Sequence, residues 1–106
     1  MKVDVLFFDG CPSYEALMPR LRTLVREAGQ DEDAIVLHRV ESAEEAGAQR
    51  FLGSPTVRVD GVDVDPGAAE RDDFGMKCRI YRSADGQTHV PPDGWIRSAL
   101  DAARGR

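Results

Sequence analysis

The sequence predicts a single α/β domain with a mixed four-stranded sheet flanked by helices, in the order β-α-β-α-β-β-α. Three observations predict this class. The chain opens with a run that is apolar on both faces, the apolar positions then take a helical period, and two alternating segments follow in the second half. A length of 106 residues suits one compact domain, so residues 1–106 are expected to form one unit.

The first half of the chain reads as strand, helix and strand. Residues 2–8, KVDVLFF, are typical of a buried central strand. A helix is expected from Pro12, which suits a first turn, to Gly29, with Pro19 expected to kink its interior. Its apolar stripe has helical spacing and comprises Tyr14, Leu17, Met18, Leu21, Leu24, Val25 and Ala28. Residues 35–41, IVLHRVE, predict a second strand, parallel to the first with a right-handed crossover.

A second helix and a third strand follow. Ser42 and Glu45 have the spacing of a capping box, and the short helix that they open is expected to end near Leu52–Gly53. Residues 55–61, PTVRVDG, alternate between apolar and polar positions and end in a turn signal at Asp60–Gly61. They therefore predict a strand with Val57 and Val59 on one face.

The remaining elements are a fourth strand and a final helix. Residues 78–82, CRIYR, predict a strand antiparallel to the third, with Ile80 opposite Arg79 and Tyr81. Residues 62–77 are long for a hairpin loop, and loops of this length are usually functional or mobile. A turn signal stands at Asp85–Gly86. The final helix is predicted by an apolar stripe of Ile96, Ala99, Leu100 and Ala103.

The composition excludes several function classes. The net charge of −5 argues against binding to nucleic-acid phosphates or to anionic membranes. No apolar run approaches the roughly 20 residues that span a bilayer, and no signal-peptide pattern is visible, so a cytoplasmic protein is expected. The acidic residues Asp60, Asp63 and Asp65 lack calcium-loop spacing and are expected in a solvated loop. The pattern indicates no particular oligomeric state.

One cysteine occupies a distinctive place. In FFDGCPSYEALMP, residues 7–19, Cys11 lies between the first strand and the first helix. Free N–H groups and the positive end of the helix dipole meet there, which favours the thiolate, the nucleophilic form of cysteine. The carboxyl end of a parallel strand is also where α/β folds place their sites. We expect a partly exposed, reactive Cys11; the alternative is a small buried side chain.

Several motifs resemble the thioredoxin and glutaredoxin superfamily. CPSY, residues 11–14, resembles its active-site turn, with Tyr14 in place of the second cysteine. Pro19 stands where the active-site helix of thioredoxin carries a proline, and GSPTV, residues 53–57, resembles the cis-proline loop. The predicted order of elements is also that of the family. The resemblance covers most of the chain and implies a thioredoxin-like fold.

The resemblance also implies roles and an activity. Cys11 would be the catalytic nucleophile of a thiol-disulfide oxidoreductase that forms a mixed disulfide, with Pro55 as the cis-proline against it. Ser54 would offer backbone hydrogen bonds to an extended thiol substrate. The implied substrate-binding residues are Pro12, Ser13, Tyr14, Ser54, Pro55 and Thr56. No bound cofactor is implied; glutathione or another small thiol would be the co-substrate, and a small thiol or a protein disulfide the partner.

The departures from the family leave alternatives open. Gly10 stands in place of the usual tryptophan, and the turn has only one thiol. Cys11 therefore works with an external thiol, pairs with Cys78, or binds a soft metal. If Cys78 begins the returning strand, five strand residues of roughly 17 Å separate the two cysteines, whereas a disulfide needs Cα atoms within about 7 Å. A fold-back of residues 62–77 would bring them together.

The second alternative is a mercury-linked protein. MKCRIYR, residues 76–82, resembles the second-cysteine region of organomercurial lyases, which cleave a carbon–mercury bond with two cysteines and an aspartate. Tyr14 stands where that aspartate would be, and Asp9 is the nearest acid. Mercury binding by Cys11 and Cys78, with or without cleavage, is thus one alternative. A binding module with an inert Cys11 is the other.

Overall fold

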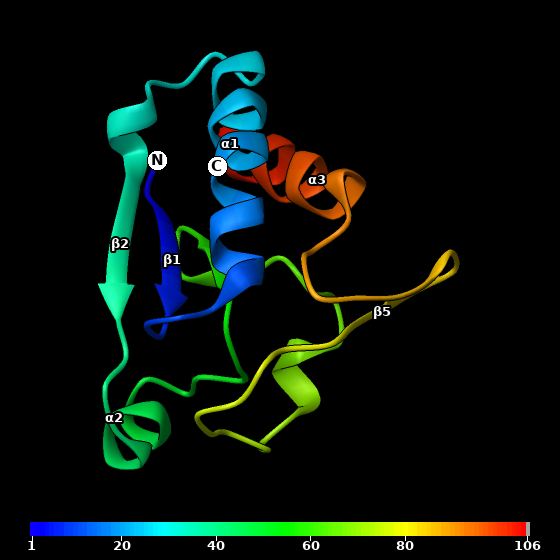
Figure 1. Cartoon of the computed structure of the whole chain (residues 1–106). Coiled ribbons are helices and arrows are strands. Elements are labelled where there is room, and N and C mark those ends of the chain that lie inside the picture. Colours follow the sequence, from blue (N-terminus) through cyan, green and yellow to red (C-terminus); the bar gives the residue numbers. More distant parts are fainter. Residues whose placement is uncertain (106) are drawn as a thin grey trace.

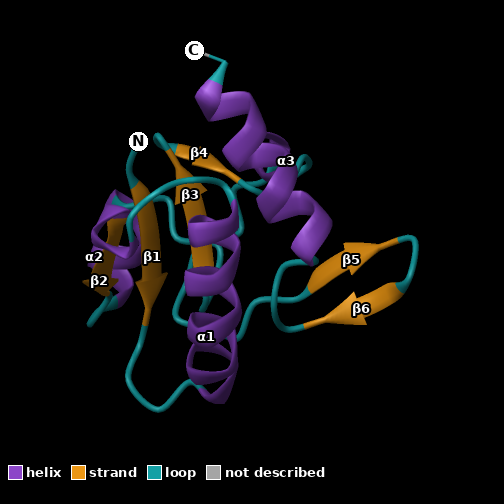
Figure 2. Cartoon of the chain, turned by 90° about the horizontal axis from the view of Figure 1, so that it is seen from above, coloured by secondary structure: helices purple, strands orange, loops and turns teal. Residues whose placement is uncertain are grey.

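The computed structural model describes residues 1–105 and shows a mixed α/β fold with a four-stranded mixed sheet and three α-helices (Figure 1). The sheet contains β1 (Val3–Phe7), β2 (Ile35–Arg39), β3 (Thr56–Val59) and β4 (Val62–Asp63). The helices are α1 (Pro12–Glu27), α2 (Ala43–Ala48) and α3 (Asp93–Arg104), with short 3-10 turns η1 (Glu32–Ala34) and η2 (Ala68–Glu70). A separate hairpin contains β5 (Tyr81–Ser83) and β6 (Gly86–Thr88), and it projects away from the sheet (Figure 2). None of the described helices is both long and apolar enough to span a bilayer.

The strand order β2-β1-β3-β4 places β1 inside the sheet. β1 is parallel to β2, with Val5 opposite Leu37, and antiparallel to β3, with Val5 opposite Val57. The prediction of a central first strand that is parallel to the second is therefore confirmed, and its antiparallel pairing with β3 is a finding of the structure. Because β1 has neighbours on both edges, its backbone groups are paired along its length.

The two faces of the sheet carry different layers. Val3 and Val5 alternate with Leu6, as the period of a strand requires. One face packs against α1 and α3, which lie side by side (Figure 2), through a core that includes Val3, Val5, Leu17, Leu21, Val57, Ile96 and Leu100. The other face packs against α2 through Leu6, Val40, Ala46 and Phe51. α2 thus covers the second face only around Leu6, and the predicted stripes of the first and last helices are confirmed as core.

The prediction for the fourth strand is wrong. β3 turns at Asp60–Gly61 and returns at once as β4, a strand of two residues. The predicted strand at residues 78–82 is not part of this sheet; Tyr81–Ser83 pairs with Gly86–Thr88 instead. Asp60 and Gly61, both at positive φ, allow the tight turn. Residues 64–80 are consequently free to fold back across the molecule.

Smaller corrections concern the second helix. Ser42 caps α2 as predicted, because its Oγ accepts from the Glu45 N–H at 3.1 Å. The Glu45 carboxylate, however, accepts from the Glu41 N–H and not from that of Ser42. The helix ends at Ala48, earlier than expected, and Arg50 has a positive φ of 55° that helical geometry does not allow.

Candidate functional site

Cys11 is the N-cap of α1, and Pro12 is the first helical residue. The expectation of a partly exposed thiol is wrong, because Cys11 is only 2% exposed. The chain on its two sides is drawn together by Phe7 and Tyr14, whose rings stack at a centroid distance of 3.9 Å and an interplanar angle of 4°. This stack joins the end of β1 to the first turn of α1. Residues 8–11, here named the thiol turn, therefore connect two elements whose ends are held together by this ring contact.

Residues 53–56, here named the proline loop, lie against the thiol turn. The Phe8 N–H donates to Ser54 Oγ at 3.3 Å. The Ser54–Pro55 peptide bond is cis, as expected for this loop. Ser54 and Thr56 are fully buried, and Thr56 Oγ1 donates to the Gly53 carbonyl at 2.7 Å. The structure thus brings together the two segments on which the predicted site depends.

Residues 77–81, here named the strap, run beside the proline loop. The Ser54 N–H donates to the Lys77 carbonyl at 2.8 Å, and the Arg79 N–H donates to the Ser54 carbonyl at 3.0 Å. These two bonds make an isolated parallel bridge between Ser54 and Cys78. The backbone groups of Ser54 that were expected to bind a substrate are therefore occupied by the protein's own chain.

The bridge also places Cys78. Side chains of directly paired residues point to the same face, so Cys78 shares the face of Ser54, whose hydroxyl contacts the thiol turn. Met76 lines a pocket together with Phe8 and Asp9, which shows independently that this part of the chain reaches the thiol turn. Cys78 is exposed, and both cysteines are free thiols. The predicted separation of the two cysteines assumed a regular fourth strand at Cys78, and the structure has no such strand there.

A fully buried arginine anchors the strap. Arg79 donates to both carboxylate oxygens of Asp63, at 2.7 and 3.0 Å, and to Thr56 Oγ1 at 3.1 Å. Its guanidinium also lies 4.5 Å from the centre of the Tyr81 ring and 3.4 Å from Asp65 Oδ2. Burial by itself lowers the pKa of Arg79, but Tyr81 and the paired carboxylates more than offset this and raise it above its ordinary value. The expectation that Asp63 and Asp65 lie in a solvated loop is wrong.

The strap contacts the proline loop at two further points. The Tyr81 hydroxyl donates to the Pro55 carbonyl, and burial raises the pKa of Tyr81. Gly53 has a φ of +128°, and a Cβ there would lie 2.9 Å from the Lys77 carbonyl oxygen and 3.0 Å from Arg79 Cα. Only glycine allows this combination of backbone conformation and close approach.

Arg79 and Tyr81 are site residues that the sequence prediction missed. The alternation itself was visible, because Arg79 and Tyr81 fall on one face of CRIYR and Ile80 on the other. The structure buries the first face completely and leaves Ile80 37% exposed. The sequence did contain a signal for them. An arginine on the inward face of a strand, with two acids earlier in the chain, indicates a buried ion pair.

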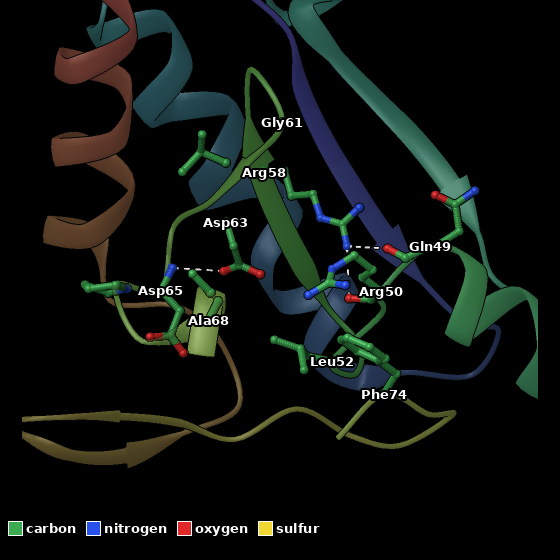
Figure 3. Close-up of a pocket in the computed structure, with 12 residues that line it drawn as sticks. Gln49, Arg50, Leu52, Arg58, Gly61, Asp63, Asp65, Ala68 and Phe74 are labelled. Atoms are coloured by element: carbon green, nitrogen blue, oxygen red, sulfur yellow. Dashed lines mark hydrogen bonds between the residues drawn. The ribbon is translucent and has the colours of Figure 1, made fainter. Parts of the chain in front are cut away.

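Two pockets are lined by residues of the segments described above. One, of about 410 Å³, is lined by Arg58, Asp63 and Phe74 among others (Figure 3). Arg58 Nη2 donates to the carbonyls of Gln49 and Arg50 and so holds one wall of this pocket. Neither cysteine lines it.

The other pocket, of about 560 Å³, lies at the thiol turn and is lined by Phe8, Asp9, Arg39, Val40, Glu41 and Met76. Asp9, the acid nearest to Cys11 in sequence, is exposed, and its Oδ1 pairs with Arg39 Nε at 3.0 Å.

The two thiols differ in exposure, and the proline loop connects the segments that carry them. The Cys11 thiol is buried at a helix N-terminus, and the exposed Cys78 is held beside the proline loop that contacts the thiol turn. Of the other predicted binding residues, Tyr14 stacks on Phe7 and Ser13 is half-buried in the first helical turn. Within residues 1–105, no group of three or more His, Cys, Asp or Glu side chains is placed to hold a metal ion. No protein-family model, curated protein or solved structure matches the chain.

Proposed function

We propose that the protein is a thiol-disulfide oxidoreductase of thioredoxin-like fold in which Cys11 attacks the substrate and Cys78 resolves the mixed disulfide. The observation that carries the proposal is the position of Ser54. Its hydroxyl accepts from the thiol turn while its backbone is bridged to Cys78. The strand order and the helix N-terminus at Cys11 support the same proposal, because both agree with the implied fold.

The proposed reaction has two thiol exchange steps. The Cys11 thiolate attacks one sulfur of a disulfide, forms a mixed disulfide and releases the other sulfur as a thiolate, which takes up a proton. The Cys78 thiolate then attacks the Cys11 sulfur and releases the second substrate thiol. The substrate gains two electrons and two protons, and the protein is left with a Cys11–Cys78 disulfide. A small thiol such as glutathione, acting as the reductant, restores the two free cysteines.

The burial of Cys11 sets a condition on the first step. A thiol that is 2% exposed meets a substrate only when the thiol turn or the strap opens locally. The exposed Cys78 needs no such opening. This division suits a buried attacking thiol that is protected from random oxidation and a resolving thiol that is already near the surface.

The two cysteines are tested by comparing Cys11→Ser and Cys78→Ser with the unchanged protein. After mixing with a small disulfide, mass spectrometry should show the internal disulfide in the unchanged protein and a trapped mixed disulfide in Cys78→Ser. Cys11→Ser should lose turnover. If Cys78→Ser turns over as fast as the unchanged protein, the resolving thiol is external. If Cys11→Ser does so, Cys11 is inert, as in a binding module.

Binding of a soft metal by the same pair is a second candidate. It is favoured by the bridge that holds Cys78 beside the proline loop, since two thiolates are ligands of soft cations such as Hg²⁺. Binding would release one proton from each thiol. One Hg²⁺ per chain, lost in either cysteine variant, would support this candidate. Cleavage of a carbon–mercury bond is not expected, because Tyr14 supplies no carboxylic acid at the predicted place.

A further inference from the structure

We infer that the strap makes the thiol site selective for compact disulfides and closes it to extended polypeptides. This inference names the substrate class of the proposed oxidoreductase and rests on that function. Its basis is that the backbone N–H and carbonyl of Ser54 are hydrogen-bonded to Lys77 and Arg79, which the structure shows independently of any reaction.

Extended polypeptides are usually bound by pairing with free backbone groups at an exposed edge. At this site the Ser54 hydroxyl contacts the thiol turn, so the backbone N–H and carbonyl of Ser54 are the groups with which a polypeptide would pair. Its N–H and its carbonyl both bond to the strap, at 2.8 and 3.0 Å. A polypeptide would therefore have to replace the strap before it gained the same two hydrogen bonds, so pairing at Ser54 adds little affinity.

Displacement of the strap would disrupt several buried contacts. The Arg79 guanidinium would leave both oxygens of Asp63, and the Tyr81 hydroxyl would leave the Pro55 carbonyl. Separating these groups while either one stays buried would leave a polar group without its partner, which is costly. The close contact at Gly53 shows that strap and loop are fitted to each other at van der Waals distance.

Compact ligands need the same local opening at Cys11 but do not have to replace the two strap bonds at Ser54. The pocket of about 560 Å³ at the thiol turn has a size typical of small-molecule sites. Phe8, Val40 and Met76 contribute apolar surface to it, and Asp9 and Arg39 contribute charges of both signs. Neither cysteine lines this pocket, but a low-molecular-weight disulfide would fit in it beside the thiol turn without any backbone pairing and would react with Cys11 once the turn opens.

The test compares two mixed disulfides that share one leaving thiol. One carries N-acetylcysteinamide, and the other carries a longer neutral peptide with a central cysteine. In the unchanged protein the ratio of their rate constants, peptide over compact, should not exceed about twofold. A peptide that reacts about tenfold faster would overturn the inference, because it would show that backbone pairing contributes to binding.

A matched pair of variants separates the strap from general effects. Asp63→Asn weakens the anchor of Arg79, whereas Asp73→Asn alters an exposed carboxylate that pairs with Lys77 on the same segment. The peptide-to-compact ratio should rise several-fold in Asp63→Asn and stay unchanged in Asp73→Asn, with melting curves confirming that both are folded. Equal ratios in all three proteins would contradict a role of the strap.

A second measurement is independent of the thiol chemistry. In a chain with Cys11→Ser and Cys78→Ser, hydrogen exchange of the Arg79 amide reports its bond to the Ser54 carbonyl. Saturating amounts of the peptide should leave its protection unchanged. A loss of protection would show that peptides replace the strap, and the inference would fail. If the unchanged protein reacts with neither disulfide, the proposed function fails, while the exchange result still decides the inference.

Discussion

Arg79 and Asp63 form a two-point ion pair that fastens the strap to β4. The guanidinium is fully buried and the Asp63 side chain is 13% exposed, so neither group is well solvated. Sixteen positions separate the two residues in the chain. The pair therefore makes a long-range contact between β4 and the strap. Because Cys78 precedes Arg79 in the strap, this contact also positions Cys78.

Removal of Asp63 should destabilise the protein strongly. Asp63→Ala leaves the buried guanidinium with Thr56, the Tyr81 ring and the more distant Asp65, and the loss of one partner of a buried pair costs about 3–5 kcal/mol. Urea unfolding measures this as a lower midpoint. Asp65→Ala is the matched control and should cost clearly less, because its contact is longer at 3.4 Å. Equal losses in the two variants would mean that the pair is not the main anchor.

Gly53 should tolerate no side chain. Gly53→Ala forces a Cβ against the Lys77 carbonyl and Arg79 at a φ of +128°, and overpacking of this kind costs about 1–3 kcal/mol in addition to the backbone strain. The strap should move away, which would speed alkylation of Cys78. Gly29→Ala is the control, with a positive φ of 80° but open space around it. Gly29→Ala should lower the stability without changing the alkylation rate of Cys78. An equal change of that rate in both variants would refute the contact between Gly53 and the strap.

Alkaline pH should unfold the protein through Tyr81. Burial raises the pKa of Tyr81 above the 10.0 of a free phenol, so above that pH the unfolded chain loses a proton that the folded chain keeps. The contribution of the protonated Tyr81 to the free energy of unfolding is complete below pH 10.0. Above that pH it falls by up to about 1.4 kcal/mol per pH unit. Tyr81→Phe should show a shallower fall in the free energy of unfolding.

The same variant should be less stable near neutral pH, by about 1 kcal/mol, because the hydrogen bond to the Pro55 carbonyl is lost. Denaturant unfolding at a series of pH values measures both effects. Identical slopes above pH 10.0 in the two proteins would show that Tyr81 ionises as freely as in the unfolded chain.

Tyr14 should control access to Cys11. Tyr14→Ala removes the stack on Phe7 that joins β1 to α1, so the thiol turn should open more often and Cys11 should be alkylated several-fold faster. An aromatic pair of this kind contributes about 0.5–1.5 kcal/mol beyond its buried area. Tyr14→Phe keeps the ring and should leave the rate unchanged. A Cys11 rate unaffected in Tyr14→Ala would mean that the stack does not limit access.

Much of the candidate site was visible in the sequence because its signals are local. Cys11 at a strand-to-helix junction, Pro12 in the first turn and the glycine-to-threonine loop around Pro55 each occupy a few consecutive residues. The helix stripes are also local, since they need only a 3.6-residue period. The two segments meet because β1 and β3 are sheet neighbours, a pairing that the structure shows and that the order of elements along the chain does not fix.

The errors have two physical causes. β4 contains only Val62–Asp63, too short for any alternation to be recognised, so the longer alternating segment at Cys78–Arg82 was assigned in its place. The exposure of Cys11 was misjudged because a helix N-terminus says nothing about which side chains cover it. Here Cys11 is 2% exposed in the turn between Phe7 and Tyr14, whose rings stack on each other.

The amino-acid order by itself predicted the three helices, the first three strands with β1 in a central place, and Cys11 and Pro55 as candidate site residues. Only the tertiary structure decided that Cys78 lies beside Ser54 and that Arg79 is buried. These contacts rest on one isolated bridge and one ion pair between distant residues. Contacts of that kind have no period and no fixed spacing along the chain, so they exist only once the whole fold brings their partners together.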